Sequence, residues 1–236
     1  MSQGDIVGLI ASYVYAFGLL FGVEALGKRL RWPQAVTRKI VHIGAGMWIW
    51  GTLALFDAWF YGIIPFATFI VLNTIFYRQQ SFKAMDSRDS SPGTVYFAIS
   101  ITILFALLWR TGGELDRAPI AAAGVMAMTW GDGLASLVGY SWGRHQYTFL
   151  GHTRSWEGSA AMATGGFVAM FLTLWLLPGS ALSPNSEPFG ILGSLILAVA
   201  GTVIATIAEG FSPAGTDNLS VPLLTGALLY LASVLL

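Results

Sequence analysis

The sequence has no cysteine and few charged residues for its length. Without cysteine, the chain forms neither a disulfide framework nor a thiolate metal site. Charged residues make up 10% of the 236 residues, against about 25% in an ordinary soluble domain. Twelve Lys and Arg side chains balance twelve Asp and Glu side chains. Because no net charge attracts a polyanion, we expect no nucleic-acid partner.

Several familiar signals are also absent. The first residues, MSQGDIVGLIASYV, carry no basic stretch ahead of their apolar run, so they are interpreted as a first membrane span and not as a cleaved signal. The chain has no GxxxxGK[ST] phosphate loop, and its three histidines lack the HExxH spacing of a zinc site. These absences exclude a P-loop nucleotide site and a zinc site of that kind.

Long apolar runs dominate what is present, with 55% of the residues hydrophobic. A helix needs about 17 to 25 apolar residues to cross the bilayer. The sequence therefore predicts an integral membrane protein: an all-α, multi-pass transmembrane bundle of about eight spans, forming a single domain over residues 1–236. The expected spans lie near residues 5–26, 40–56, 58–77, 93–110, 118–140, 158–177, 189–208 and 218–236. The second and third are the hardest to divide, because only Phe56, Asp57 and Ala58 separate them.

The basic residues are unequally distributed between the two sides of this bundle. The side that holds the N-terminus and its matching loops has only Arg110 and Arg117. Loops rich in Lys and Arg face the cytoplasm. Because most polar residues of interest lie on the basic side, we expect a site that faces the cytoplasm. The basic side carries Lys28, Arg29, Arg31, Arg38, Lys39, Arg78, Lys83, Arg88, Arg144 and Arg154.

Asp132 stands inside an apolar run, AAAGVMAMTWGDG. An ionisable side chain at that depth is a functional hypothesis by default. Gly131 and Gly133 on either side would let a ligand or metal approach the backbone closely. A carboxylate there suits a hydrated Mg²⁺ that carries phosphates. The alternative interpretation is a structural carboxylate paired with an arginine of another helix.

A second cluster, Arg38, Lys39 and His42, begins the second expected span. Arg38 and His42 are four residues apart and share a helix face, so a guanidinium and an imidazole could converge on one anion. The plainer interpretation is that Arg38 and Lys39 only orient the span, while His42 caps a helix contact.

The segment from residue 140 to 156 combines glycines, cations and hydroxyls ahead of an expected helix start. Such a loop suits phosphate, because backbone N–H groups at a helix N-terminus attract anions. A basic cytoplasmic loop would explain some of these residues, but not Glu157 at the start of a span. The candidate phosphate ligands are Arg144, Gly151, Arg154, Ser155 and Gly158.

Glu209, Asp217 and Asn218 flank the link between the last two spans. Their oxygen atoms could hold a second metal ion or the far side of the first. Equally, Asp217 or Asn218 could simply cap the last helix. Glu24 lies four residues before Lys28, and we interpret this pair as a structural ion pair.

Four stretches together resemble the phytol kinase and farnesol kinase family, which is related to dolichol kinase and to the CTP-dependent diacylglycerol kinase. They are RKIVHIG, GDGLASLVGYSWG, TRSWEGS and AEGFSPAGTDNLSVPL, and the resemblance covers roughly residues 36–226. GDG, SWEGS and DNLSVP are specific in combination, whereas each alone is weak. Relatives often have lysine at the position of Arg154, and the segment from Glu209 to Asp217 differs in detail among them.

The resemblance implies a membrane kinase that phosphorylates a prenyl alcohol, such as phytol, farnesol or geranylgeraniol, with CTP or another nucleoside triphosphate and Mg²⁺. The alcohol and the surrounding membrane lipids are the expected partners. Phosphoryl transfer depends mostly on positioning and on neutralising charge. On this hypothesis Asp132, His42 and Glu157 are catalytic, with Asp132 or His42 as the base. The metal ligands would be Asp132, Glu157, Glu209, Asp217 and Asn218. The phosphate ligands would be Arg38, Lys39, Gly131, Gly133, Arg144, Gly151, Arg154, Ser155 and Gly158.

Two other classes of function stay open. A lipid-phosphate cytidylyltransferase would use similar parts and release pyrophosphate, but a KDxxG-type signature with a following GGxxDR is absent. A transporter holds its substrate near the bilayer midplane in broken helices, whereas the polar residues here crowd one interface. The preferred alcohol, the choice of nucleotide and the oligomeric state are not decided by the sequence, and an oligomer is possible.

Overall fold

The computed structural model describes residues 1–236 except 83–84, 86–90, 112–115, 150–151, 214 and 236. Its helical segments follow the eight expected spans to within a few residues at most ends, and α5, η1 and α6 continue one another as a single long element. The elements are α1 (Gln3–Leu30), α2 (Gln34–Leu55), α3 (Trp59–Gln79), α4 (Gly93–Leu108), α5 (Ala118–Met126), η1 (Ala127–Asp132), α6 (Gly133–Trp142), β1 (Gln146–Phe149), β2 (His152–Ser155), α7 (Trp156–Leu176), α8 (Gly190–Phe211) and α9 (Asp217–Ser233).

Five of these segments are long and apolar enough to cross a membrane: α1, α3, the continuous α5–η1–α6 element, α7 and α8. With 16 and 17 residues, α4 and α9 are shorter. Large apolar side chains lie exposed along α1, α7 and α8, among them Val14, Leu172 and Leu192. Such outward apolar faces are typical of helices that contact lipid. The prediction of an all-α membrane protein is therefore confirmed.

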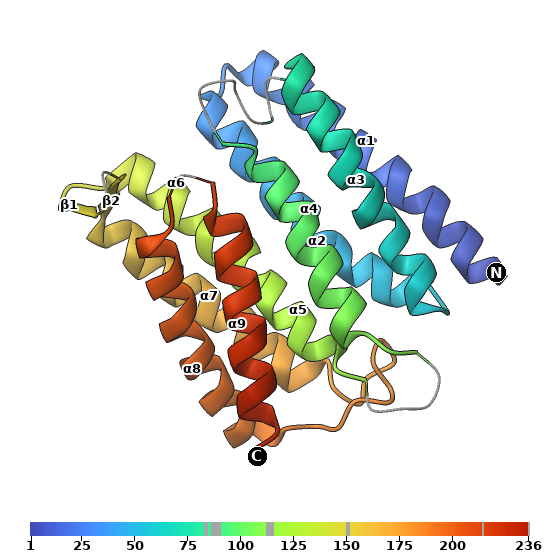
Figure 1. Cartoon of the computed structure of the whole chain (residues 1–236). Helices are drawn as coiled ribbons and strands as arrows, with labels where there is room; N and C mark the ends of the chain where they lie inside the picture. The colour runs from blue at the N-terminus through green and yellow to red at the C-terminus, as the bar shows by residue number, and fades with distance from the viewer. Residues whose placement is uncertain (83–84, 86–90, 112–115, 150–151, 214, 236) are drawn as a thin grey trace.

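The bundle divides into two groups of helices around a central element (Figure 1). Helices α1–α4 gather on one side, and α7, α8 and α9 lie on the other. Between them, α5 is entirely buried, from Ala118 to Met126. Its small residues allow close approach, since a Cβ on Gly124 would lie 2.9 Å from the carbonyl oxygen of Pro222 in α9. The central element therefore ties the two groups together.

The turn between α2 and α3 is where the sequence prediction was hardest. Here α2 ends at Leu55 and α3 begins at Trp59, so the expected division is confirmed. The buried carboxylate of Asp5 fixes this turn, because its Oδ1 accepts hydrogen bonds from the backbone N–H groups of Asp57 and Ala58, each 3.1 Å long. The start of α1 and the α2–α3 turn thus share one end of the bundle.

The opposite end, which we call the polar end, carries the α1–α2 link, the β1–β2 hairpin and the start of α9 (Figure 1). Most of the basic residues that the sequence analysis assigned to one side lie here. Lys83 and Arg88 lie outside the described residues. At this end Glu24 and Lys28 form the expected ion pair, with 2.8 Å between Oε1 and Nζ.

The hairpin is a difference from the sequence prediction, which expected a loop between residues 140 and 156. Strands β1 and β2 pair antiparallel, with Tyr147 opposite Arg154. Strand β1, QYTF, holds tyrosine, threonine and phenylalanine, which favour extended backbone, whereas β2, HTRS, holds threonine alone of these types. Because side chains alternate along a strand, the hairpin directs Arg154 and Thr153 to opposite faces.

Glycine pairs behave differently from one helix to the next. A Cβ on Gly44 would lie 2.7 Å from Leu19, and one on Gly46 would overlap the side chain of Thr129, so this pair permits close helix packing. At Gly18 and Gly22, by contrast, no described atom lies within 4 Å of an added Cβ. Spacing by four identifies a helix face but not its partner.

Candidate active site

Asp132 is the last residue of η1, a π-helical turn inside the central element. Its side chain is 2% exposed, and its Oδ2 accepts a hydrogen bond of 2.6 Å from Lys39 Nζ of α2. The buried carboxylate is therefore paired with a lysine, where the structural alternative in the sequence analysis expected an arginine. Single π-helical turns are rare and are frequent at functional sites.

His42 lies one helical turn after Lys39 on the same face of α2. Its Nε2 donates a hydrogen bond of 3.1 Å to the carbonyl oxygen of Met128 in η1. In the neutral imidazole, that donor places the remaining lone pair on Nδ1. The ring also stands edge-on against Phe97 of α4, with 4.8 Å between centroids. His42 is thus fixed in one orientation by groups from two other elements.

Arg154 at β2 reaches the facing ends of α8 and α9. Its Nε lies 2.9 Å from Glu209 Oε1, and its Nη2 lies 3.5 Å from Asp217 Oδ2. The same Nη2 donates to the carbonyl oxygen of Ser212, 3.4 Å away. A guanidinium can hold two carboxylates at once because its donors form a planar fork. Residues 154, 209 and 217, distant in the sequence, therefore meet at one point.

A carboxylate and an amide side chain of this cluster keep unused oxygen atoms. Glu209 Oε2 and Asn218 Oδ1 are buried and have no hydrogen-bond partner among the described residues. The charges of Asp132, Glu209 and Asp217 act on one another, and these three carboxylates face two ion-paired cations, Lys39 and Arg154. Within the described chain no three His, Cys, Asp or Glu residues form a ready metal cluster. A metal ion here would therefore need oxygen atoms from a bound phosphate in addition to those of the protein. Mg²⁺ is commonly bound in this way, by a few carboxylates and the phosphates of a substrate.

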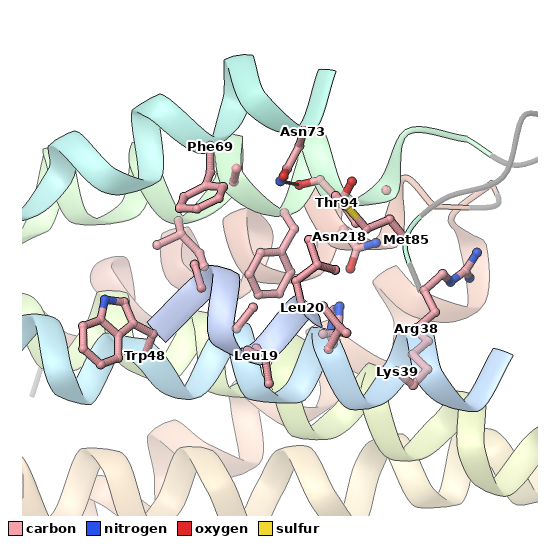
Figure 2. Close-up of a pocket in the computed structure, with 18 of the residues that line it drawn as sticks. Leu19, Leu20, Arg38, Lys39, Trp48, Phe69, Asn73, Met85, Thr94 and Asn218 are labelled. Carbon is pink, nitrogen blue, oxygen red and sulfur yellow. Dashed lines mark hydrogen bonds between the residues drawn. The ribbon is translucent and has the colours of Figure 1, made fainter. Parts of the chain in front are cut away.

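A cavity of about 240 Å³, which we call the amphipathic pocket, opens beside this cluster between α1, α2, α3 and α4. Figure 2 shows Arg38 and Lys39 at one end of it and Trp48 at the other, with Leu19 and Leu20 between them. The polar end also includes His42, Asn73, Arg154, Asp217 and Asn218, and the rest is mostly apolar, lined by Leu19, Leu20, Val41, Ala45, Phe66, Phe69, Phe97, Ala98 and Ile101.

A second cavity of about 250 Å³, which we call the hairpin pocket, lies between the hairpin, α6 and the start of α7. Ser155 and Gly158 line it, and Ser155 Oγ caps α7 by accepting from the backbone N–H of Gly158 at 3.1 Å. Ser136 and Arg154 line both pockets, and Glu209 lines the hairpin pocket. The two cavities therefore adjoin at Ser136 and Arg154.

Comparison with known proteins identified relatives of this chain. A phytol kinase of Synechocystis sp. is 36% identical over 92% of this chain and 87% of its own length. The chain belongs to the phytol kinase and farnesol kinase family. A probable chloroplastic phytol kinase of Triticum aestivum is 28% identical over 89% of this chain and 71% of that protein. A chloroplastic farnesol kinase of Arabidopsis thaliana is 26% identical over 96% of this chain and 76% of that protein. No family model matches the chain, and no solved structure does.

Most candidate residues that the family resemblance implied meet at the junction of the two pockets. Gly131 and Gly133 pack closely against neighbouring helices on the side where a Cβ would point. A Cβ on Gly131 would lie 2.7 Å from Met162 Sδ, and one on Gly133 would lie 2.8 Å from Ile43 Cγ1, so both glycines permit helix packing. The residues that line a pocket or pair with its lining are Arg38, Lys39, His42, Asp132, Arg154, Ser155, Gly158, Glu209, Asp217 and Asn218.

Two other candidates lie elsewhere. Glu157 lines neither pocket; its Oε1 lies 2.6 Å from His145 Nδ1, and both its oxygens accept from the backbone N–H of His145. Glu157 therefore ties the start of the hairpin to α7. Arg144 is exposed and also lines neither pocket. Gly151 lies outside the described residues.

Sequence reasoning missed Ser136, Asn73, Tyr15 and Trp48, all of which line the amphipathic pocket. Ser136 follows Asp132 by four residues, a spacing that places two side chains near one helix face. Asn73 is a polar residue within an apolar span, and its Nδ2 donates a hydrogen bond of 3.0 Å to the carbonyl oxygen of Thr94. Tyr15 and Trp48 carried no such signal, because aromatic residues are common in membrane helices.

Proposed function

We propose that this chain transfers the γ-phosphoryl group of CTP to the hydroxyl of a membrane-dissolved prenyl alcohol, with phytol as the main acceptor and farnesol or geranylgeraniol as others. The observation that carries the proposal is the amphipathic pocket. It joins an apolar space among four helices to a polar end with buried acids and cations. The names of the relatives, phytol kinase and farnesol kinase, support the same reaction.

The pocket matches the two halves of such an alcohol. The isoprenoid tail would lie along the apolar faces of α1, α2, α3 and α4, where it loses contact with water and lipid alike. The hydroxyl would then lie at the polar end, near His42 and Asn218. Binding the tail between membrane helices lets the enzyme take its substrate without extracting it into water.

The nucleotide would enter through the hairpin pocket. Its phosphates would meet the hydroxyl where the two cavities adjoin, beside Arg154 and Ser136. Arg38 makes no ion pair with any described residue, so its guanidinium is available for a phosphate, and Lys39 lines the same end of the amphipathic pocket. Cations around the transferred group stabilise the charge of a phosphoryl transition state.

Mg²⁺ would lie among the oxygen atoms at this junction. Glu209, Asp217 and Asn218 would hold it, since Glu209 Oε2 and Asn218 Oδ1 are buried acceptors without a described partner. The ion would supply neutralisation of charge on the β- and γ-phosphates. Asp132 would act through Lys39, by holding the ammonium group at the pocket end.

His42 is our choice for the base. In the reaction, the alcohol oxygen forms a bond to the γ-phosphorus while the bond from that phosphorus to the β-bridging oxygen breaks and CDP leaves. The hydroxyl proton would pass to His42 Nδ1, because Nε2 donates to Met128. Asp132 is less suited to this role, since its Oδ2 already accepts from Lys39.

We also infer that the polar end faces the cytoplasm. Arg29, Arg31, Arg38 and Arg144 all belong to this end, whereas Arg110 and Arg117 belong to the other. Basic loops remain on the cytoplasmic side during insertion. A nucleoside triphosphate would then reach the hairpin pocket from the compartment in which it is made.

The test is a product analysis with the purified protein in detergent, Mg²⁺ and a panel of phytol, farnesol and geranylgeraniol. With CTP labelled in the γ-phosphate, the proposal predicts a labelled lipid monophosphate and unlabelled CDP. Absence of labelled lipid with every alcohol would overturn it. Label from the α-phosphate in a lipid product, with release of pyrophosphate, would instead identify a cytidylyltransferase.

A further inference from the structure

The end of the amphipathic pocket opposite the ion cluster is lined by a stacked aromatic pair. Trp48 of α2 stacks on Tyr15 of α1, with 4.5 Å between ring centroids and 21° between planes. Trp48 Nε1 donates a hydrogen bond of 3.0 Å to Ser12 Oγ, and Tyr15 Oη donates one of 2.7 Å to the carbonyl oxygen of Gly44. Each ring is therefore held by stacking and by its own hydrogen bond.

The directions of the helices place Trp48 at the floor of the pocket. Helices α1 and α3 run toward the polar end, while α2 and α4 run away from it (Figure 1). The lining residue farthest from the polar end is accordingly the first one on α1 and α3 and the last one on α2 and α4. These four are Ser12, Pro65, Trp48 and Ile101.

The pocket has a definite depth along α2. Arg38, Val41, His42, Ala45 and Trp48 line it, and this spacing follows one face of a helix. Trp48 follows Arg38 by ten positions, so the lined face is about 15 Å long at 1.5 Å per residue. Trp48 thus lies at the far end of this face, where its indole would meet the tail of a bound hydrocarbon chain.

We propose that the Trp48 and Tyr15 pair sets the upper limit on the length of the prenyl chain that the enzyme accepts. The inference rests on the proposed kinase function, because it assumes that the tail occupies the amphipathic pocket. A rigid aromatic floor excludes longer chains by steric overlap, while shorter chains leave part of the apolar space unfilled. Trp48 is therefore a specificity-determining residue.

Two opposite substitutions test the proposal. Trp48→Ala removes the floor and should shift the ratio of kcat/KM toward alcohols at least one isoprene unit longer, by about ten-fold or more, the effect of one misfitted apolar group. Ala45→Leu fills the pocket one turn closer to the polar end and should shift the ratio toward shorter alcohols. Trp175→Ala is the matched control, because Trp175 of α7 is exposed and lines neither pocket.

Each outcome decides a different point. The measurement uses purified protein, CTP and prenols of increasing length, with lipid phosphates identified by mass. Opposite shifts in the two variants, with none in the control, support the proposal. Equal losses for all alcohols in both variants, or an unchanged profile, overturn it. If Trp48→Ala does not fold, the Ala45→Leu profile decides. A wild-type protein that phosphorylates no prenol would refute the kinase function itself.

Discussion

Asp132 and Lys39 place a carboxylate and an ammonium group together inside the bundle. Their side chains are 2% and 9% exposed, and burying such charges costs more than their attraction returns unless the geometry is good. The pair lies next to the amphipathic pocket, which Lys39 lines. The position of the pair therefore indicates that Asp132 holds the Lys39 ammonium group at the reacting end of the pocket.

Asp132→Asn should abolish turnover and also lower stability. The substitution leaves the Lys39 ammonium without a counterion, and breaking a buried pair in this way costs about 3–5 kcal/mol. The measurements are thermal unfolding in detergent and formation of lipid phosphate. The double variant Asp132→Leu with Lys39→Met removes both charges, so it should regain stability without regaining activity. Near-normal turnover in Asp132→Asn would contradict the role given to the pair.

Arg154→Lys keeps the positive charge but removes the planar fork. A lysine cannot hold Glu209 and Asp217 in the same geometry, so we expect kcat/KM for CTP to fall about ten- to one-hundred-fold, the value of one charge-assisted hydrogen bond. Arg29→Lys, at an exposed position in the last turn of α1, is the matched control. Equal activity of the two variants would show that the fork is not needed.

At the scale of residues, sequence reasoning found the charged groups and missed the apolar ones. Asp132, Lys39 and Glu209 were identifiable because a charge within an apolar run needs an explanation. Trp48 was not, because an aromatic residue in such a run has the same appearance whether it fills a core or lines a cavity. Glu157 was assigned to chemistry by its position at a helix start, whereas the structure pairs it with His145.

Among the elements, the α2–α6 contact controls the geometry of the ion pair. Gly133 follows Asp132 directly, and a Cβ there would lie 2.8 Å and 3.0 Å from two carbon atoms of Ile43 on α2. Helix α2 carries Lys39 and His42, so any separation of the two helices moves these residues away from η1. The site depends on this close contact.

Gly133→Val should therefore reduce activity strongly and lower stability by about 1–3 kcal/mol, the usual cost of overpacking. Gly18→Val is the matched control, because a Cβ at Gly18 meets no described atom within 4 Å. Both variants are compared by thermal unfolding and by turnover with phytol. A Gly133→Val protein as active as the Gly18→Val protein would show that the contact does not position the site.

Helix positions followed from hydropathy to within a few residues at most ends, because a membrane span needs a minimum apolar length. Local irregularities of the backbone could not be predicted from hydropathy. The π-helical turn η1 has no distinct signal in AMTWGD, and the hairpin is too short for alternation to stand out. Both depend on tertiary packing, and both help to position the site.

For the whole molecule, sidedness is the property to test. The chain has no cysteine, so single cysteines at exposed positions report sidedness without background. Thr148→Cys in β1 should react with a membrane-impermeant maleimide from the cytoplasmic side, and Asn185→Cys in the α7–α8 link only from the other side. Labelling of both from one side would contradict the single crossing, by α7, between them, and the reverse pattern would invert the orientation.

The central claim is that one cavity among α1–α4 receives the alcohol while the nucleotide comes from the hairpin side. Photo-crosslinking tests it most directly, with wild-type protein, a farnesol analogue that carries a diazirine at its tail, and mapping of the adduct by mass spectrometry. We predict adducts on α1 and α2 near Tyr15, Ala45 and Trp48, suppressed by excess phytol. Adducts confined to the outward faces of α7 and α8, and unaffected by phytol, would contradict the account.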